Sequence, residues 1–300
     1  MGQFIVDVND LSRSFGRKTA LDGVCFRAAV GQVYGLVGAN GAGKTTLLKH
    51  LLGLLRAQSG SVRVFGLDPV RDPVGVLSRV GYLSEERELP EWMRVDELMR
   101  YTQAYHPTWD ASYARELIEM FGLDPSKKIK ELSKGMRAQA GLVAAVAHRP
   151  ELLILDEPSS GLDAVVRRDI LDAIVRTVAD DGRTVIFSSH LLEEVERMSD
   201  HVTMLQDGRV TLSGELDDVR RGYHRTRVRF VESFDHPPVI DAALVMEGGG
   251  RTWSVIHNGS LEQFHRSVLA LGGEVVESRD ATLEEIFLAR AGRNRQVVAA

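Results

Sequence analysis

Three short runs of apolar and β-branched residues mark this sequence as an alternation of strands and helices. The runs are GQVYGLVG (31–38), LLILDE (152–157) and TVIFSSH (184–190). Each is almost continuously apolar, which is typical of strands covered on both faces of a parallel sheet. The first run leads into a glycine-rich turn and then into the apolar helix KTTLLKHLLGLL (44–55). This order of strand, loop and helix predicts an α/β core.

The periodicity changes to that of amphipathic helices between residues 88 and 143. In YARELIEMFGL the apolar residues recur at helical spacing and share one stripe, made of Ala114, Leu117, Ile118 and Phe121. We therefore expect a helical subdomain at about residues 88–143, inserted between strands of the core.

A hairpin and a change of composition follow the last strand of the core. HVTMLQDGRVTLSG (201–214) places Asp207-Gly208 between two apolar strands, which is a strong hairpin signal. The chain then becomes basic, and we place a domain boundary at Gly222. The remaining residues predict strands at 227–231, 243–247, 252–257 and 274–278 and helices at 261–272 and 283–292. The expected organisation is a domain of residues 1–222 and a small α+β accessory domain of residues 223–300.

Composition and charge limit the function classes. The 300 residues are 44% hydrophobic and 26% charged, which is typical of a soluble globular protein. The formal net charge of −5 argues against nucleic acid as the main partner. Residues 220–229 hold five arginines, but they lack the interleaved aromatic residues of an RNA-binding surface. We interpret this run as a solvated linker and strand edge.

The cysteine count and the apolar runs bear on compartment and membrane insertion. The single cysteine, Cys25, excludes an internal disulfide framework, and its place in the alternation VCF predicts a small core residue. The N-terminus lacks the layout of a signal peptide, and no apolar run approaches the roughly 18 residues needed to span a bilayer. We expect a cytosolic protein whose membrane role, if it has one, is exerted through a partner.

The sequence GANGAGKTT (38–46) predicts a phosphate site. It fits the pattern G-x-x-x-x-G-K-[ST] and lies between a predicted strand and a predicted helix, as that motif requires. In this pattern Lys44 reaches the β- and γ-phosphates, and the Thr45 hydroxyl ligates Mg²⁺. A flexible glycine turn is the alternative. The residues assigned to the nucleotide are Gly38, Asn40, Gly41, Gly43, Lys44, Thr45 and Thr46.

Two acids end the predicted strand LLILDE. The carboxyl edge of a parallel strand is where nucleotide sites of open α/β sheets form. We assign Asp156 to Mg²⁺ and Glu157 to the attacking water as general base. Two acids at a solvated strand end are the alternative, which the nearby phosphate motif disfavours.

A second anion site is predicted at ELSKGMRAQAG (131–141). Ser133 has the properties of an N-cap before a run of helix formers, and the backbone N–H groups of a helix start bind anions. An ordinary capped helix is the alternative. One nucleotide does not need both this helix start and the phosphate motif.

These motifs, together with LSKGM (132–136), SSGLD (159–163) and the strand end SSH (188–190), resemble the ATP-binding cassette (ABC) ATPases that drive membrane transporters. The resemblance covers about residues 4–220. YHPTWD, DPSKKIKELSKGM and LDEPSSGLD further resemble a bacterial subgroup of export-type cassettes that are encoded apart from their membrane subunits. The resemblance implies a P-loop NTPase core of ABC type that uses ATP and Mg²⁺.

The resemblance also implies a dimer in which each ATP lies between two subunits. Ser133 and the N–H of Gly135 would then cap the γ-phosphate of ATP held by residues 38–46 of the partner. Asp163 would lie at the subunit interface. His190 would hydrogen-bond the γ-phosphate, although a histidine that merely starts a helix is an open alternative.

The sequence departs from the family pattern at four positions. Lys134 and Met136 stand at the third and fifth positions of the common signature LSGGQ. The third position therefore needs no dihedral angle that only glycine adopts, whereas the position of Gly135 could still need one. Glu85 stands where relatives have a glutamine that touches Mg²⁺ and the attacking water. Phe15 replaces the usual tyrosine that stacks on adenine, and a buried strand aromatic is its alternative.

The resulting hypothesis is an ABC ATPase on the cytoplasmic face of the membrane. It would pair with a transmembrane subunit and with a second ATPase subunit, either identical or a sister. Trp92 is a candidate contact for the transmembrane subunit, and a core role is its alternative. Two alternatives are a non-transport cassette acting on ribosomes or DNA and a nucleotide-binding module that no longer hydrolyses. Glu157 and His190 disfavour the second. The histidines of residues 223–300, which are His224, His257 and His265, lack metal-like spacing.

Overall fold

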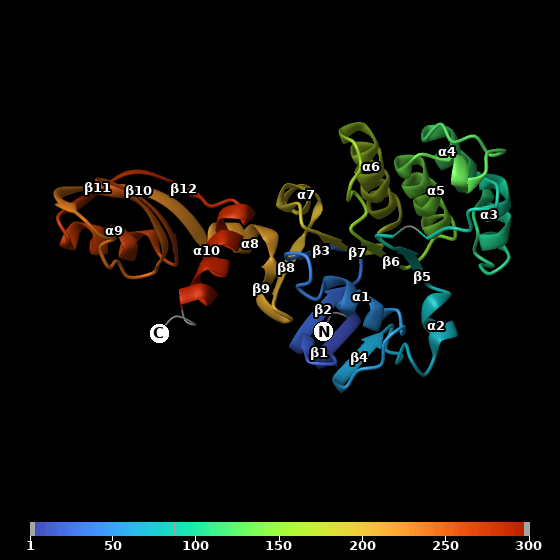
Figure 1. Cartoon of the computed structure of the whole chain (residues 1–300), viewed down its shortest axis with the longest axis horizontal. Helices are drawn as coiled ribbons and strands as arrows, with labels where there is room; N and C mark the ends of the chain where they lie inside the picture. Colours follow the sequence, from blue (N-terminus) through green and yellow to red (C-terminus); the bar gives the residue numbers. More distant parts are fainter. Residues whose placement is uncertain (1–3, 87, 297–300) are drawn as a thin grey trace. The chain divides into compact units, whose positions relative to one another are not determined.

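The chain forms two compact units in a computed structural model that describes residues 4–86 and 88–296. The units are Met1–Leu212 and Ser213–Ala300 (Figure 1). The division precedes the boundary that we placed at Gly222, because helix α8 (Leu216–Arg221) packs against strand β10 (Tyr223–Phe234) of the second unit. Each unit is described separately below.

A six-stranded sheet organises the first unit. Its order is β5-β6-β7-β3-β8-β9. The strands are β3 (Val33–Val37), β5 (Val80–Leu83), β6 (Leu152–Asp156), β7 (Thr184–Ser189), β8 (His201–Gln206) and β9 (Arg209–Glu215). The pairs β5–β6, β6–β7, β7–β3 and β3–β8 are parallel, and β3, β6 and β7 are buried along their whole length. The predicted α/β core is confirmed, and the carboxyl ends of these strands meet at one edge.

The hairpin between β8 and β9 is also confirmed. Asp207 and Gly208 have φ angles of 50° and 78°. Two consecutive left-handed residues make the tight turn that suits the twist of antiparallel strands. The turn therefore follows from the Asp-Gly pair in the sequence.

A smaller antiparallel sheet of order β2-β1-β4 lies in the same unit. Its strands are β1 (Phe4–Phe15), β2 (Lys18–Ala29) and β4 (Ser59–Val64). On β2 the side chains of Val24 and Phe26 are buried, whereas Cys25 is exposed. The expectation that Cys25 is a core residue was wrong, because alternate residues of a strand point to opposite faces of the sheet.

Helices pack on the sheets of the first unit and on one another. They are α1 (Lys44–Leu51), α2 (Pro73–Leu77), α3 (Val95–Gln103), α4 (Ala111–Met120), the 3-10 turn η1 (Ile129–Glu131), α5 (Lys134–Val146), α6 (Ala164–Asp181) and α7 (Leu192–Met198). The helices α3, α4 and most of α5 fill the predicted helical segment 88–143. On α4 the predicted stripe faces inward, with Ala114 and Leu117 buried. None of the helices in the described part of the chain is long and apolar enough to cross a bilayer.

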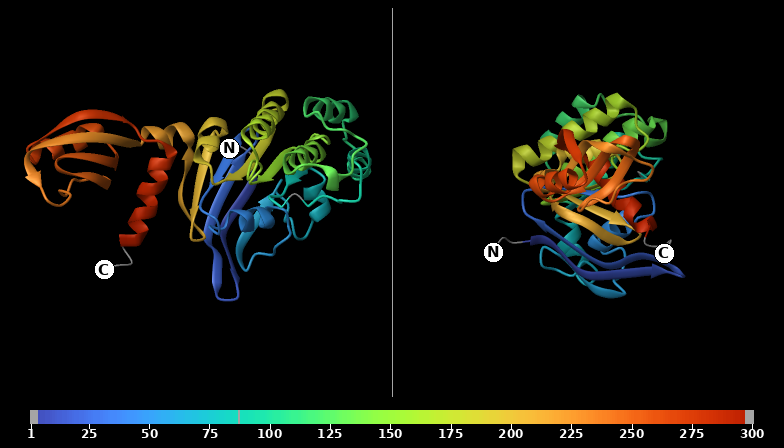
Figure 2. Two further views of the ribbon diagram at one scale, coloured as in Figure 1. Left: turned by 45° about the horizontal axis from the view of Figure 1, so that its top comes forward. Right: turned by 90° about the vertical axis from the view of Figure 1, so that its left-hand side faces the viewer.

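The second unit is an α+β unit built on a three-stranded antiparallel sheet of order β11-β10-β12 (Figures 1 and 2). Besides α8 and β10 its elements are β11 (Ala243–Asn258), α9 (Leu261–Ala270), β12 (Gly273–Asp280) and α10 (Leu283–Gln296). The two strands predicted at 243–247 and 252–257 are continuous in β11. Its core contains Phe230, Trp253 and Phe264.

We expected the arginine run of residues 220–229 to lie in a linker and on a strand edge. The structure contradicts the strand edge. β10 is the central strand, and its arginines pair with acids of neighbouring elements. The pairs are Arg225 with Glu285, Arg227 with Glu277 and Arg229 with Glu274. These pairs offset the positive charge of the strand within the unit.

Candidate nucleotide site

The phosphate loop, residues 38–46, connects β3 to α1. Gly41 and Gly43 have φ angles of 83° and 111°, which L side chains rarely adopt, and a Cβ on Gly38 would collide with the carbonyl oxygen of Leu205. No side chain caps the start of α1. Its first N–H groups therefore remain available to an anion at the positive end of the helix.

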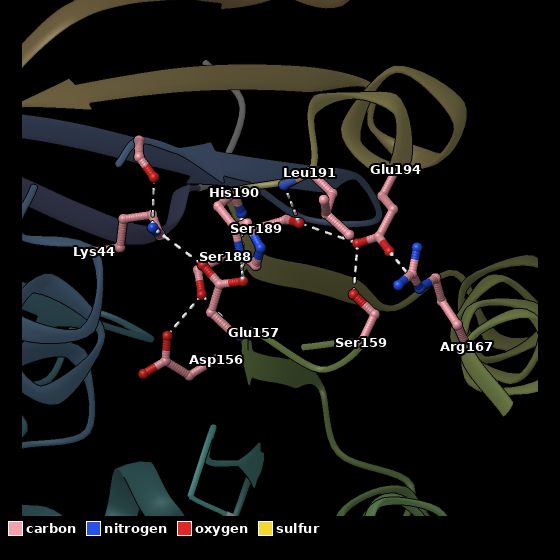
Figure 3. A network of polar contacts seen from close by, with 11 residues as sticks. Lys44, Asp156, Glu157, Ser159, Arg167, Ser188, Ser189, His190, Leu191 and Glu194 are labelled. Atoms are coloured by element: carbon pink, nitrogen blue, oxygen red, sulfur yellow. Dashed lines mark hydrogen bonds and ion pairs between the residues drawn. The ribbon is translucent and has the colours of Figure 1, made fainter. Parts of the chain in front are cut away.

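Lys44, the first residue of α1, is buried beside this loop. Its Nζ donates to the carbonyl oxygen of Gly38 at 2.6 Å and lies 3.1 Å from Oε1 of Glu157 (Figure 3). A buried ammonium group requires such partners. The sequence motif and the acidic strand end, which are more than a hundred residues apart, are thus in direct contact.

The acids at the end of β6 have different neighbours. The register of β6 and β7 places Asp156 opposite Ser188, and the Ser188 hydroxyl donates to Asp156 Oδ1 at 2.6 Å. The same hydroxyl accepts a hydrogen bond from the backbone N–H of Glu157 at 2.9 Å. Glu157 has a left-handed φ of 48°, which turns the chain sharply after the strand. One serine therefore orients both acidic residues.

His190 completes the contact with Glu157. Its Nδ1 lies 2.7 Å from Glu157 Oε2, and its backbone N–H donates to the same oxygen at 3.3 Å. The imidazole is 42% exposed, whereas the Glu157 side chain is only 5% exposed. α7 begins two residues later, at Leu192, so His190 precedes the helix and contacts a carboxylate as well. Glu157 is held between a lysine and a histidine.

A cavity of about 340 Å³ opens beside Lys44 and Glu157, and neither Asp156 nor His190 is among its lining residues. This volume lies within the range of small-molecule sites. Its lining contains the phosphate loop and Glu157 together with Phe15 and Glu85. Phe15 is 47% exposed, so the alternative of a buried strand aromatic is wrong. Two residues assigned from the sequence to adenine and to Mg²⁺ therefore share one cavity with the phosphate loop.

Ser133, Gly135 and Asp163 are not part of this cavity lining. Ser133 is the N-cap of α5, since its Oγ accepts from the N–H of Met136 at 3.2 Å. Asp163 Oδ1 accepts from the first N–H groups of α6 at 3.0 Å. The predicted helix start is confirmed, and its place outside the cavity is consistent with a function toward another molecule.

Gly135 lies in a tightly packed part of α5 and does not adopt a special dihedral angle. It is buried within α5 and has no left-handed φ. A Cβ at this position would lie 3.0 Å from the side chain of Val166 on α6. Lys134 projects beside Gly161, where an added Cβ would collide with its Nζ. α5 therefore lies close against α6 and the loop before it.

Sequence reasoning did not assign Ser159, Ser188, Ser189 or Glu194. The serines occur in the strand-end and loop motifs, which was the available signal. Glu194 lies among several acids of LLEEVERM and has the appearance of a solvated helix residue in the sequence. In the structure it is buried and contacts Ser159 and Ser189.

Comparisons with known proteins identify the family. Residues 21–160 match the family model described as ABC transporter. The chain is 32% identical to the daunorubicin resistance ATP-binding protein DrrA3 of Streptomyces coeruleorubidus, over 99% of both chains. It is 28% identical to the ABC transporter ATP-binding protein YtrB of Bacillus subtilis, over 97% of this chain and all of the relative.

A solved structure supports the same assignment. The structure titled "Structure of ATP binding subunit of ABC transporter" superposes with a TM-score of 0.67 at 31% identity, and it covers 72% of this chain and 92% of that one. The chain belongs to the ABC transporter ATP-binding proteins. It is an ABC ATPase that binds ATP, and the family resemblance found in the sequence is confirmed.

Proposed function

We propose that this chain is the ATPase subunit of a bacterial exporter and works on the cytoplasmic face of the membrane with separate transmembrane subunits. The observation that carries the hydrolytic part is Glu157, held between Lys44 and His190 beside the phosphate loop. Export is supported by the relative DrrA3, which aligns with this chain over 99% of both and is named a daunorubicin resistance ATP-binding protein.

We assign the steps of hydrolysis to residues that line the cavity and to His190 beside it. Phe15 offers its ring to the adenine, and the phosphate loop with Lys44 binds the β- and γ-phosphates. Glu157 takes a proton from the attacking water as general base. His190, which contacts Glu157, donates to the γ-phosphate.

Oxygen donors of the site fit Mg²⁺. Across residues 4–86 and 88–296, no group of three or more His, Cys, Asp or Glu side chains could hold a metal ion. An ion here needs oxygens from the nucleotide as well, which is how proteins usually bind Mg²⁺. Thr45 and Glu85 line the cavity and Asp156 adjoins Glu157, so these three would hold it. The bound ion would neutralise charge on the phosphates.

The start of α5 supports a dimer. Ser133 is exposed, while the backbone around Gly135 is held against α6. A helix N-terminus fixed in this way favours an anion supplied by another molecule. In the proposed dimer, identical or with a sister subunit, this anion is the γ-phosphate bound by the partner's phosphate loop, and Asp163 lies at the interface. Residues 223–300 would serve as an accessory domain.

Trp92 provides a test of the membrane partner. It lies between β5 and α3 and is 70% exposed, and large aromatic residues of this kind often dominate interfaces. The tagged chain should copurify with a multi-helix membrane protein from solubilised membranes. Trp92→Ala should uncouple transport and reduce that copurification, with basal hydrolysis within about twofold of the wild type, whereas Trp92→Phe should restore most of both.

Unchanged transport by Trp92→Ala would count against this contact. Copurification with ribosomes or DNA and with no membrane protein would instead favour a non-transport ABC ATPase.

Glu85 provides a second test, which concerns Mg²⁺ binding and the coupling of ATP hydrolysis to transport. An ionised carboxylate can ligate Mg²⁺ but cannot donate a hydrogen bond to the water, whereas glutamine can do both. Glu85→Gln should therefore retain ATPase activity, and Glu85→Ala should weaken the coupling of hydrolysis to transport. Parallel measurements of phosphate release and transport check this. An inactive glutamine variant beside an unaffected alanine variant would exclude the assignment.

A further inference from the structure

Glu194 on α7 is a buried carboxylate whose partners come from three other segments of the chain (Figure 3). Its Oε2 accepts from the Ser159 hydroxyl at 2.7 Å and from the Ser189 hydroxyl at 3.0 Å. Its Oε1 lies 3.7 Å from Nε of Arg167 on α6. A carboxylate is costly to bury unless it is paired and hydrogen-bonded, and these contacts meet that requirement.

The two serines belong to the segments that carry the proposed catalytic groups. Ser189 ends β7 directly before His190, and its hydroxyl also accepts from the N–H of Leu191 at 3.0 Å. The backbone on both sides of His190 is thus tied to Glu194. Ser159 is fully buried, two residues after Glu157, at the start of the loop that leads to Asp163.

We propose that Glu194 is a positioning residue that fixes the turn of His190 against the loop between Glu157 and Asp163. This inference rests on the function proposed above for His190 and Glu157. Because one carboxylate oxygen accepts from both serines, a displacement of either segment changes the bond to the other. His190 is 42% exposed, so its own packing constrains it only in part.

Substitutions at Glu194 and at the serines separate these contacts. Glu194→Ala removes both acceptor bonds and the ion pair with Arg167. Glu194→Gln retains one acceptor oxygen for the serines but loses the charge, so it should be a partial rescue. Ser159→Ala and Ser189→Ala each remove one of the two bonds. Glu193→Gln is the matched control, because Glu193 is exposed on the same helix.

The first measurement is steady-state ATP hydrolysis by the purified full chain. Glu194→Ala should lower kcat at least about tenfold, since two charge-assisted bonds that align the groups are lost. The KM for ATP should stay within about twofold, because the phosphate loop and Lys44 keep their contacts. Glu194→Gln should fall between, and Glu193→Gln should equal the wild type. A wild-type kcat in Glu194→Ala would overturn the inference.

A double-mutant cycle and a spectroscopic probe distinguish positioning from mere stability. Glu194→Ala should reduce kcat less in a Ser189→Ala background than in the wild type, because the two residues share one bond. The imidazole NMR signals of His190, assigned with His190→Ala, should shift in Glu194→Ala and in Ser159→Ala. Unshifted signals, or a loss of kcat that only follows the loss of folded protein, would overturn the inference. If the His190 signals shift in the variants but the wild-type chain hydrolyses no ATP, the result would support positioning and exclude the proposed function.

Discussion

Glu157→Gln should abolish ATP hydrolysis and leave ATP binding intact. The amide keeps the size of the side chain and an oxygen for Lys44, but it cannot take a proton from water. Loss of a general base usually costs about 10²- to 10⁴-fold in rate, so kcat should fall by that range. Single-turnover phosphate release and calorimetric ATP binding, measured on the same preparation, check both parts.

The control for Glu157→Gln is Glu193→Gln, which removes an equal charge from the exposed side of α7 and should hydrolyse normally. Equal rates near zero for the wild type and Glu157→Gln would indicate a nucleotide-binding module without hydrolysis. Equal and substantial rates would remove Glu157 from the mechanism.

Ser133→Arg should reduce phosphate release to background, with ATP affinity within about threefold of the wild type. The large cation would block the start of α5, where Ser133 is exposed. It would leave the phosphate loop and Lys44 untouched, because Ser133 is not among the residues that line their cavity. Phosphate release and nucleotide titration distinguish the two effects. Normal hydrolysis by this variant would remove the argument for a shared site.

Mixing two inactive variants gives a sharper test of the same dimer. Ser133→Arg has an intact phosphate loop, and Lys44→Met has an intact start of α5. A dimer with one subunit of each contains one complete site, so the mixture should regain hydrolysis that neither variant shows alone. The melting temperatures of both variants control for misfolding. A mixture as inactive as its components would contradict the shared site.

Sequence reasoning predicted the architecture well where patterns are local. The buried strands are continuous apolar runs, and the Asp207-Gly208 turn follows from two residues that tolerate a left-handed backbone. It was wrong about Cys25 because an alternating pattern does not say which of its residues face the core. That depends on register, which shifts every side chain to the other face when it slips by one residue.

The site was predicted by residue type, but most of its contacts were not. Glycines and Lys44 follow a motif with a known mechanism, whereas the contact between Glu157 and His190 depends on the packing of β6 beside β7. Glu194 could not be selected among the acids of its helix, since only the packing of α7 against β3 and β7 buries it. Long-range polar contacts of this kind leave no periodic signal in the sequence.

The pairing of Lys44 with Glu157 has a consequence for timing. The ammonium group that the proposed γ-phosphate contact requires is already in contact with the carboxylate at 3.1 Å. The nucleotide and the Glu157 carboxylate therefore compete for the Lys44 ammonium group, and a bound γ-phosphate weakens the contact between Lys44 and Glu157. A diphosphate offers Lys44 only its β-phosphate, so it competes less strongly. In the proposed mechanism, the Glu157 carboxylate is therefore freed most fully in a subunit that holds ATP.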